Sequence, residues 1–415
     1  MILKAHCVLS GGRFEPVTPG LLRIQEDRIA QLGSDLSVEG EATLDFAGLA
    51  PAGFRAVIAP AFIDAHCHLE LSLLARRIRY PGSFVGWIGK LVLRKPKRLG
   101  TQLRAVTHGV RQHLAAGTAT VADISANGRS WQALIDLPIR KIAFAETLGR
   151  GPRARTALAE LPEKIHAMPP DGGLFLRGVS PHAPYSTDPQ LYRLALELAR
   201  MENLRLTSHL AEDPSELRFL DSASGPWITI LKAVGAWDKA IRPTGQTPIQ
   251  WAADLGLLDF PALLAHVNYA TDADLQRLAA GCASVAYCPL AHRYFNHPPH
   301  RYRDMLEAGI NVALGTDSAA AGSPLSILAQ AQAVHQLGGL PPSAVLAMAT
   351  IRAARALQLD HVVGSIDPGK SADLAVLAVN DNPDPLAAIL DPTARVLATF
   401  VAGHLVHRSP DVAAP

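Results

Sequence analysis

The chain has 415 residues, 48% of them hydrophobic and 18% charged, so it can form one large core and a smaller second unit. Its 39 basic and 37 acidic residues give a formal net charge of +2, which provides no basic excess for binding nucleic acid. The four cysteines (Cys7, Cys67, Cys282 and Cys288) follow neither a disulfide pattern nor a Cys-x-x-Cys pattern. With no leader-like N-terminus and no membrane-length apolar stretch, the sequence predicts a cytoplasmic protein without a membrane partner.

Both ends of the chain carry short strand-and-turn patterns. These patterns lie at 21–24 and 29–33 near the N-terminus and at 373–377, 396–401 and 405–406 near the C-terminus. We therefore expect a small β-sandwich domain built from residues 1–57 and 360–415.

Between the two ends, apolar strand patterns alternate with helical patterns. An apolar run at 57–63 leads into His66, and further runs lie at 118–123, 141–146, 174–179, 205–209, 263–266, 284–288 and 311–315. A typical helical pattern covers 189–199 and follows a start signal at 186–188. About eight strands alternating with helices predict an α/β fold, a (β/α)₈ TIM barrel, over residues 58–359.

Potential ligands and acid–base groups stand where the predicted strands end. They are His66, His68, Asp123, Glu146, His182, His209, Glu212, His266 and Asp317. In a TIM barrel the carboxyl ends of the strands carry the chemistry, so these side chains are expected to meet. Two other histidines, His108 and His113, share one helical stretch and are interpreted as surface residues.

The most informative pair is His66 and His68. Side chains alternate along a strand, so a His-x-His pair places both imidazoles on one face, and this is half of a divalent metal site. Cys67 points to the opposite face and is interpreted as a core residue.

Several motifs recur in order along the chain. They are HCH at 66–68, SPHAPY at 180–185, SHLAE at 208–212, AH at 265–266, LGTDS at 314–318 and GSIDPGKSADL at 364–374. By these motifs the chain resembles the amidohydrolase superfamily, in the branch of cytosine, guanine and S-adenosylhomocysteine deaminases and chlorohydrolases. The stretch HLELS at 68–72, with Phe84 and Trp87, resembles a subgroup that includes 6-aminodeoxyfutalosine deaminases.

The resemblance implies a metal site made of His66, His68, His209 and Asp317. Three imidazoles and a carboxylate suit one divalent ion, Zn²⁺ or alternatively Fe²⁺. Two-metal relatives usually carry a carboxylated lysine on the fourth strand, and this chain has none there, which argues for a single metal. Glu146 is interpreted as a supporting acid rather than a bridge between metals.

The resemblance also implies catalytic roles for three residues. Metal lowers the pKa of its water, and Glu212 would shuttle protons between that water and the leaving nitrogen. The alternative for Glu212 is a helix-start glutamate that favours the macrodipole. His266 would polarise the substrate or the nucleophile, and Asp317 would act both as ligand and as proton acceptor.

Substrate contacts are predicted for His182, Trp87 and Arg293. Arg293 lies in the loop after the seventh strand, where relatives often have Cys-Pro-x-Ser-Asn and this chain has Ala291-His292 instead. The connection at 213–259 carries Trp227, Trp237 and Trp251. These tryptophans either cover the site or pack the insert onto the barrel or a second subunit.

The function expected from this set is hydrolytic deamination of an amino-substituted heterocycle, such as a purine base or a nucleoside-like compound, with 6-aminodeoxyfutalosine as one candidate. The alternatives are a chlorohydrolase, an amide C–N hydrolase, or a barrel that binds metal without catalysis. The partner is a small molecule, and a homodimer is left open.

Overall fold

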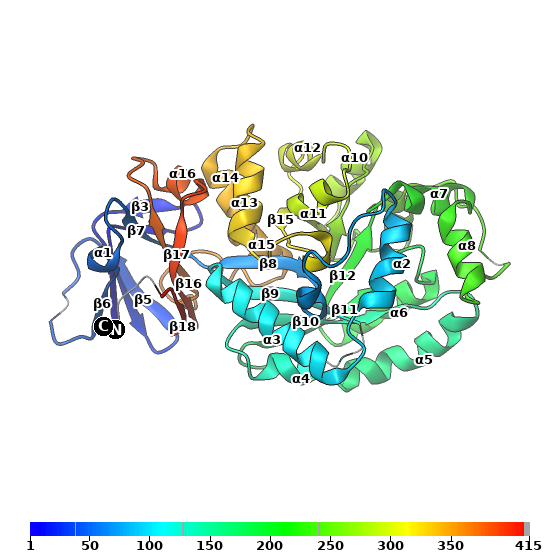
Figure 1. The fold of residues 1–415 in the computed structure, drawn as a ribbon, viewed down its shortest axis with the longest axis horizontal. Coiled ribbons are helices and arrows are strands. Elements are labelled where there is room, and N and C mark those ends of the chain that lie inside the picture. The colour runs from blue at the N-terminus through cyan, green and yellow to red at the C-terminus, as the bar shows by residue number, and fades with distance from the viewer. Residues whose placement is uncertain (38, 127, 129, 240, 411–415) are drawn as a thin grey trace.

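The computed structural model describes residues 1–37, 39–126, 128, 130–239 and 241–410. In Figure 1 a helix-covered barrel adjoins a smaller β-rich part in which the blue N-terminal strands lie beside the red C-terminal strands. Within the described residues, no helix is both long and apolar enough to cross a membrane.

Eight parallel strands form the barrel sheet, and each pairs with its neighbour in the sequence. They are β8 (Phe62–Cys67), β9 (Thr118–Ser125), β10 (Arg140–Thr147), β11 (Phe175–Pro181), β12 (Arg205–Leu210), β13 (Leu263–His266), β14 (Ser284–Tyr287) and β15 (Val312–Leu314). At the closing edge, the backbone N–H of Asp317 donates to the carbonyl of His66 at 2.9 Å. The predicted TIM barrel is confirmed.

The barrel strands are apolar because helices cover one face and packed side chains the other. Every residue of β9 and of β10 is buried, which is typical of parallel sheets and explains why these strands read as continuous apolar runs. Polar residues are therefore concentrated where the strands end.

Helices occupy the connections between these strands and the segment that follows β15. They are α2 (Phe84–Arg94), α3 (Leu99–Ala115), α4 (Ser130–Ile135), α5 (Pro152–His166), α6 (Pro189–Met201), α7 (Pro214–Ser222), α8 (Pro226–Ala233), α9 (Pro248–Asp254), α10 (Asp272–Ala280), α11 (Pro289–Tyr294), α12 (Tyr302–Glu307), α13 (Ile327–Gln336), α14 (Pro342–Ala349) and α15 (Ile351–Ala356), with 3₁₀ turns at Leu69–Leu74 and Ala319–Ala321. Helix α6 begins where the sequence predicts, because the Asp188 carboxylate accepts the backbone N–H of Gln190 at 3.0 Å.

Two further sheets are built from the chain ends. A four-stranded sheet has the order β5-β4-β1-β6 and a six-stranded sheet the order β18-β17-β16-β7-β2-β3. Their elements are β1 (Ile2–Ala5), β2 (Cys7–Ser10), β3 (Glu15–Val17), β4 (Gly20–Gln25), β5 (Arg28–Gly33), β6 (Thr43–Asp45), β7 (Arg55–Pro60), β16 (Leu374–Val379), β17 (Arg395–Val401) and β18 (His404–Arg408), with short helices α1 (Phe46–Leu49) and α16 (Pro385–Leu390). A buried core that includes Leu3, Leu22 and Phe400 contains residues of both sheets.

The apolar run at 57–63 belongs to two strands rather than one. Strand β7 pairs antiparallel with β16 in the six-stranded sheet, whereas β8 begins the barrel. The buried Arg140 at the start of β10 donates from Nε and Nη2 to the Asp373 carboxylate at 3.0 and 3.2 Å, and so ties the barrel to the C-terminal segment. The exact domain boundaries stay predictions.

Candidate metal and active site

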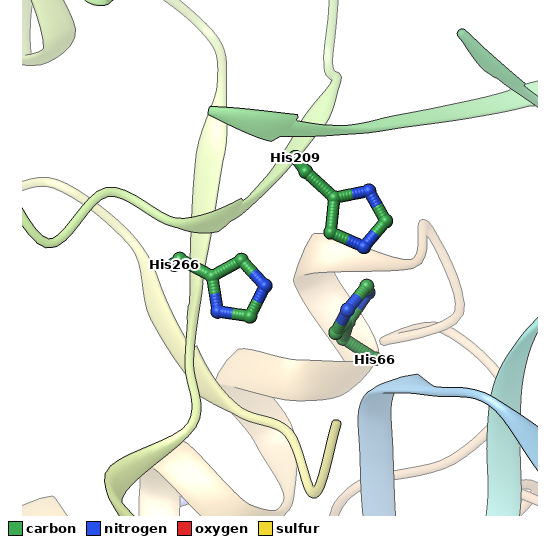
Figure 2. Close-up of side chains that lie close together, drawn as sticks. All are labelled: His66, His209 and His266. Carbon is green, nitrogen blue, oxygen red and sulfur yellow. The ribbon is translucent and has the colours of Figure 1, made fainter. Parts of the chain in front are cut away.

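Imidazole side chains from three barrel strands converge at one point. Figure 2 shows the rings of His66, His209 and His266 facing a common centre, from β8, β12 and β13. The ring centroid of His66 lies 4.8 Å from that of His209 and 5.3 Å from that of His266. The ends of the strands therefore bring together residues that lie up to 200 positions apart in the sequence.

The four predicted metal ligands lie within this cluster. The Nε2 atoms of His68 and His209 are 3.3 Å apart, and Oδ1 of Asp317 lies 3.6 Å from His68 Nε2 and 3.9 Å from His66 Nε2. The ligand atoms of His66, His68 and Asp317 all lie within 4.8 Å of one another, as do those of His66, His209 and His266. His266 is thus within ligand distance too, although the sequence assigned it only to catalysis.

The chemistry of this donor set fits a divalent ion. His66 is 1% exposed, and neither of its ring nitrogens has a hydrogen-bond partner among the described residues. Burial and the neighbouring imidazoles hold the pKa of His66 well below its usual value, and the pKa of His68 falls to about 3. Both rings are therefore neutral at physiological pH, which is the form that binds a metal.

Glu212 lies next to His266, with Oε1 3.6 Å from Nε2. The turn after β12 brings it there, because the Glu216 carboxylate accepts the backbone N–H groups of Ala211 and Glu212 at 2.9 and 3.1 Å. Burial, with the charge of Asp317 adding to it, raises the pKa of Glu212 well above its usual value. A carboxyl group in such a buried position holds a proton more readily than an exposed one, which suits a group that transfers protons.

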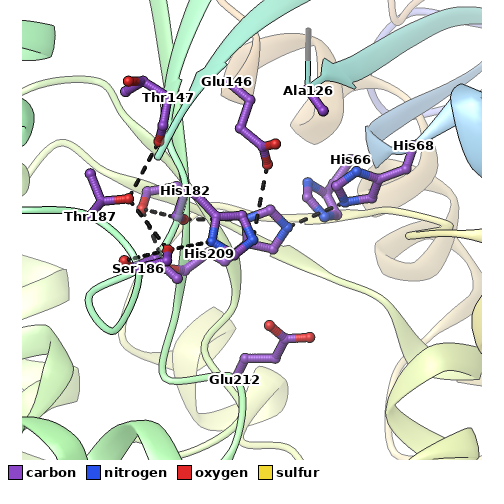
Figure 3. A network of polar contacts seen from close by, with 12 residues as sticks. His66, His68, Ala126, Glu146, Thr147, His182, Ser186, Thr187, His209 and Glu212 are labelled. Carbon is purple, nitrogen blue, oxygen red and sulfur yellow. Dashed lines mark hydrogen bonds and ion pairs between the residues drawn. The ribbon is translucent and has the colours of Figure 1, made fainter. Parts of the chain in front are cut away.

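Glu146 and His182 form a second polar pair beside the histidine cluster (Figure 3). Oε1 of Glu146 lies 4.0 Å from Nε2 of His182, and the other ring nitrogen of His182 is 2.6 Å from the Ser186 hydroxyl. Ligand atoms of Glu146, His182 and His209 also lie within 4.8 Å of one another. Burial raises the pKa of Glu146.

A cavity of about 210 Å³ opens above the cluster. Trp87, Ile88 and Leu91 of α2 line one wall, and Glu212 and His182 line the wall near the histidines. Two of the predicted substrate contacts, His182 and Trp87, therefore lie in the cavity.

The third predicted contact, Arg293, does not lie in this cavity. It sits on α11, is exposed, and lines a separate depression with His292 and His297. The reason is that the short helix after β14 directs Arg293 away from the histidine cluster, whereas Phe295, just beyond the helix, packs against Trp87 with ring centroids 4.8 Å apart.

The insert at 213–259 forms α7, α8 and α9, and two of its tryptophans pack onto the barrel. Trp227 is 4% exposed and stacks on Tyr185 at 3.7 Å between ring centroids, and Trp251 contacts Tyr192 at 4.8 Å. Trp237 is partly buried beneath Lys232. Because Tyr185 itself lines the cavity, Trp227 supports that wall from behind.

Comparison with known proteins agrees with this geometry, since residues 57–406 match the amidohydrolase family. The chain belongs to the amidohydrolase family. Among its relatives is a 5-methylthioadenosine/S-adenosylhomocysteine deaminase of Moorella thermoacetica, 26% identical over 91% of this chain and 85% of that protein. Another is a 5'-deoxyadenosine deaminase of Methanopyrus kandleri, 25% identical over 85% of this chain and 82% of the relative.

Solved structures share the fold of this amidohydrolase. Helicobacter pylori aminofutalosine deaminase, in complex with methylthio-coformycin, superposes with a TM-score of 0.85 at 22% identity, covering 98% of this chain and 100% of the other. An adenosine deaminase from Xanthomonas campestris with bound zinc gives a TM-score of 0.82 at 18% identity, over 99% of this chain and 94% of the other.

The interpretation of His113 as a surface residue is wrong. His113 is fully buried, and its Nε2 lies 2.8 Å from Oδ2 of Asp64, while His108 on the same helix is exposed. The other oxygen of Asp64 accepts the backbone N–H groups of His66 and Thr316 at 3.1 and 3.0 Å. Sequence reasoning missed this support for the metal ligands, although Asp64 stands two residues before His66 and so lies on the same face of β8.

Replacing His113 with leucine is expected to lower the stability of this amidohydrolase by about 2 kcal/mol, because the buried Asp64 carboxylate loses a charge-assisted hydrogen bond. Thermal unfolding followed by circular dichroism measures the change. The matched control is His108→Leu on the exposed side of α3, which should leave the unfolding temperature unchanged. Equal shifts for the two variants would contradict the role assigned to His113.

Proposed function

We propose that this amidohydrolase is a hydrolytic deaminase that uses one divalent metal ion and acts on an amino-substituted heterocycle in a nucleoside-like compound. The observation that carries the proposal is the position of Glu212. Its carboxyl group lies 3.6 Å from His266, lines the cavity, and stands beside four candidate metal ligands. A proton-carrying group at that point can serve both the attacking water and a leaving amine.

The ion would be held by His66, His68, His209 and Asp317, and Zn²⁺ suits three imidazoles and a carboxylate. When bound, a divalent ion lowers the pKa of a coordinated water so that a nucleophile exists at neutral pH. Strand β11 carries no lysine, which supports a single ion rather than a bridged pair.

In the proposed reaction, Glu212 moves two protons. Its Oε1 takes a proton from the attacking water and passes it to a ring nitrogen of the substrate, so negative charge does not accumulate on the ring. It then takes the remaining proton from the hydroxyl group now on the ring carbon and delivers it to the amine. The C–N bond breaks, ammonia leaves, and the carbon keeps the oxygen as a carbonyl group. Nε2 of His266 lies 3.6 Å from Oε1, and the ring would orient the carboxyl group.

The rest of the cavity supports a nucleoside-like substrate. Trp87, Ile88 and Leu91 offer apolar surface to a planar ring, and Glu146 with His182 offers polar atoms to hydroxyl groups. The deaminases among the relatives act, by their names, on adenosine compounds altered at the 5′ position. An adenine nucleoside of this kind is therefore the substrate class proposed.

Ammonia release tests the proposal directly. We expect turnover with at least one of 5′-deoxyadenosine, 5′-methylthioadenosine, S-adenosylhomocysteine and 6-aminodeoxyfutalosine, with guanine and cytosine as smaller comparisons. Enzyme stripped of metal by a chelator is the control and should release no ammonia. If none of these compounds were deaminated while chlorinated triazines or simple amides were hydrolysed, the protein would be a chlorohydrolase or an amide hydrolase.

Elemental analysis of protein purified without chelator should find about one transition metal ion per chain, because the ligand set holds one ion. His209→Ala should lose most of that metal. His108→Ala is the matched control, since His108 is an exposed histidine on α3 and lies outside the histidine cluster. Two tightly bound ions per chain would overturn the single-metal assignment.

Replacing Glu212 with glutamine should lower kcat by about 100-fold or more while metal content and fold are retained, as expected when a general acid–base group is removed. Steady-state kinetics with the substrate found in the screen, together with metal analysis, measures this. Glu197→Gln, at an exposed position on α6, serves as the control. A Glu212→Gln enzyme with near-normal kcat would show that another group carries the proton.

A further inference from the structure

The peptide group that follows β13 has an unusual conformation. His266 has a φ angle of 72° and the next residue, Val267, has a φ angle of 51°. Left-handed backbone is rare for residues other than glycine and most unfavourable for β-branched ones such as valine. Two such residues in succession persist only where surrounding contacts hold them, and here the first is a candidate catalytic residue.

One of those contacts comes from His300, in the loop between α11 and α12. Its Nε2 lies 2.8 Å from the carbonyl oxygen of His266, which belongs to the peptide group between the two left-handed residues. A carbonyl oxygen only accepts, so Nε2 carries the hydrogen and donates it. The N–H of the same peptide group, that of Val267, donates to the carbonyl of Leu210 at 3.0 Å. The bond from His300 therefore holds the oxygen side of a peptide group whose N–H side is held by β12.

The second ring nitrogen of His300, Nδ1, shows what a histidine contributes at this position. The residue is 8% exposed, and its Nδ1 has no hydrogen-bond partner among the described residues. A buried nitrogen without a partner is unfavourable, and an apolar ring of the same size would avoid it. Compared with an apolar ring, the imidazole provides one additional group, the N–H donor at Nε2.

The position of His300 is itself well determined. Its ring stacks on Tyr287 at the end of β14, with centroids 4.1 Å apart. The ring of Tyr302 also packs against Tyr287 at 5.1 Å and lies 6.1 Å from that of His300. This stack connects the carboxyl end of β14 to the peptide group after β13.

We propose that His300 is a positioning residue, which holds the carbonyl of His266 and thereby keeps the His266 ring facing Glu212. The inference rests on the role given to His266 in the proposed function. It adds a requirement from the loop between α11 and α12. His300 does not touch the reacting atoms and acts only through His266.

Two substitutions separate the hydrogen bond from the packing. His300→Phe keeps a stacked ring but has no donor, so kcat should fall about 10- to 100-fold with KM and metal content nearly unchanged. His300→Gln can place an amide N–H near the position of Nε2 and should recover most of kcat. His292→Phe is the matched control, because His292 lines the same depression, with its ring 5.8 Å from that of His300, and is expected to keep wild-type kcat.

Crystal structures of the variants provide a readout that does not depend on the substrate. In His300→Phe the peptide group between His266 and Val267 should rotate and the His266 ring should turn away from Glu212, whereas both should stay in place in His300→Gln. An unmoved peptide group in His300→Phe, or a kcat equal to that of His292→Phe, would overturn the inference. If the peptide group moves as expected but wild-type protein deaminates none of the tested heterocycles, the proposed function fails and the positioning role stands.

Discussion

The candidate site depends on the junction between the first and last strands of the barrel. The backbone N–H of Asp317 donates to the carbonyl of His66 at 2.9 Å, and the N–H of His68 donates back to the carbonyl of Asp317 at 3.3 Å. Asp64 reinforces the junction, because one oxygen accepts the N–H of His66 on one strand and that of Thr316 beyond the other. If this edge opened, the carboxylate of Asp317 would separate from the two histidines of β8.

Burial gives the site its electrostatic character. It lowers the pKa values of the clustered imidazoles and raises that of Asp317 to about 7. It also raises the pKa of Glu212 well above its usual value. A cation among these groups would favour the ionised form of Asp317. It would also offset part of the free energy that is lost when this carboxylate is buried. The same desolvation that creates a metal site therefore also prepares Glu212 for proton transfer.

Much of this arrangement could be predicted from the sequence, because strands buried on both faces are continuous apolar runs and their polar ends stand out. The errors came from features that periodicity alone does not resolve. His108 and His113 are five residues apart on α3, which turns them roughly 140° from each other, so one faces solvent and the other faces Asp64. The run at 57–63 spans the end of β7 in one sheet and the start of β8 in another. The sequence does not mark the boundary between them, because both strands are apolar.

The backbone is strained at or just beyond the carboxyl ends of several barrel strands. Left-handed φ angles occur at four residues that flank or carry the candidate chemistry, namely Ala211, His266, Val267 and Asp317. Each costs on the order of 1–3 kcal/mol, and close to each of them a buried side chain binds the backbone. Glu216 holds the turn at Ala211, His300 the carbonyl of His266, and Asp64 the N–H just before Asp317. None of these three belongs to the set formed by His66, His68, His209 and Asp317. They hold the backbone from which the ligands and Glu212 project, so residues outside that set help to determine the geometry of the site.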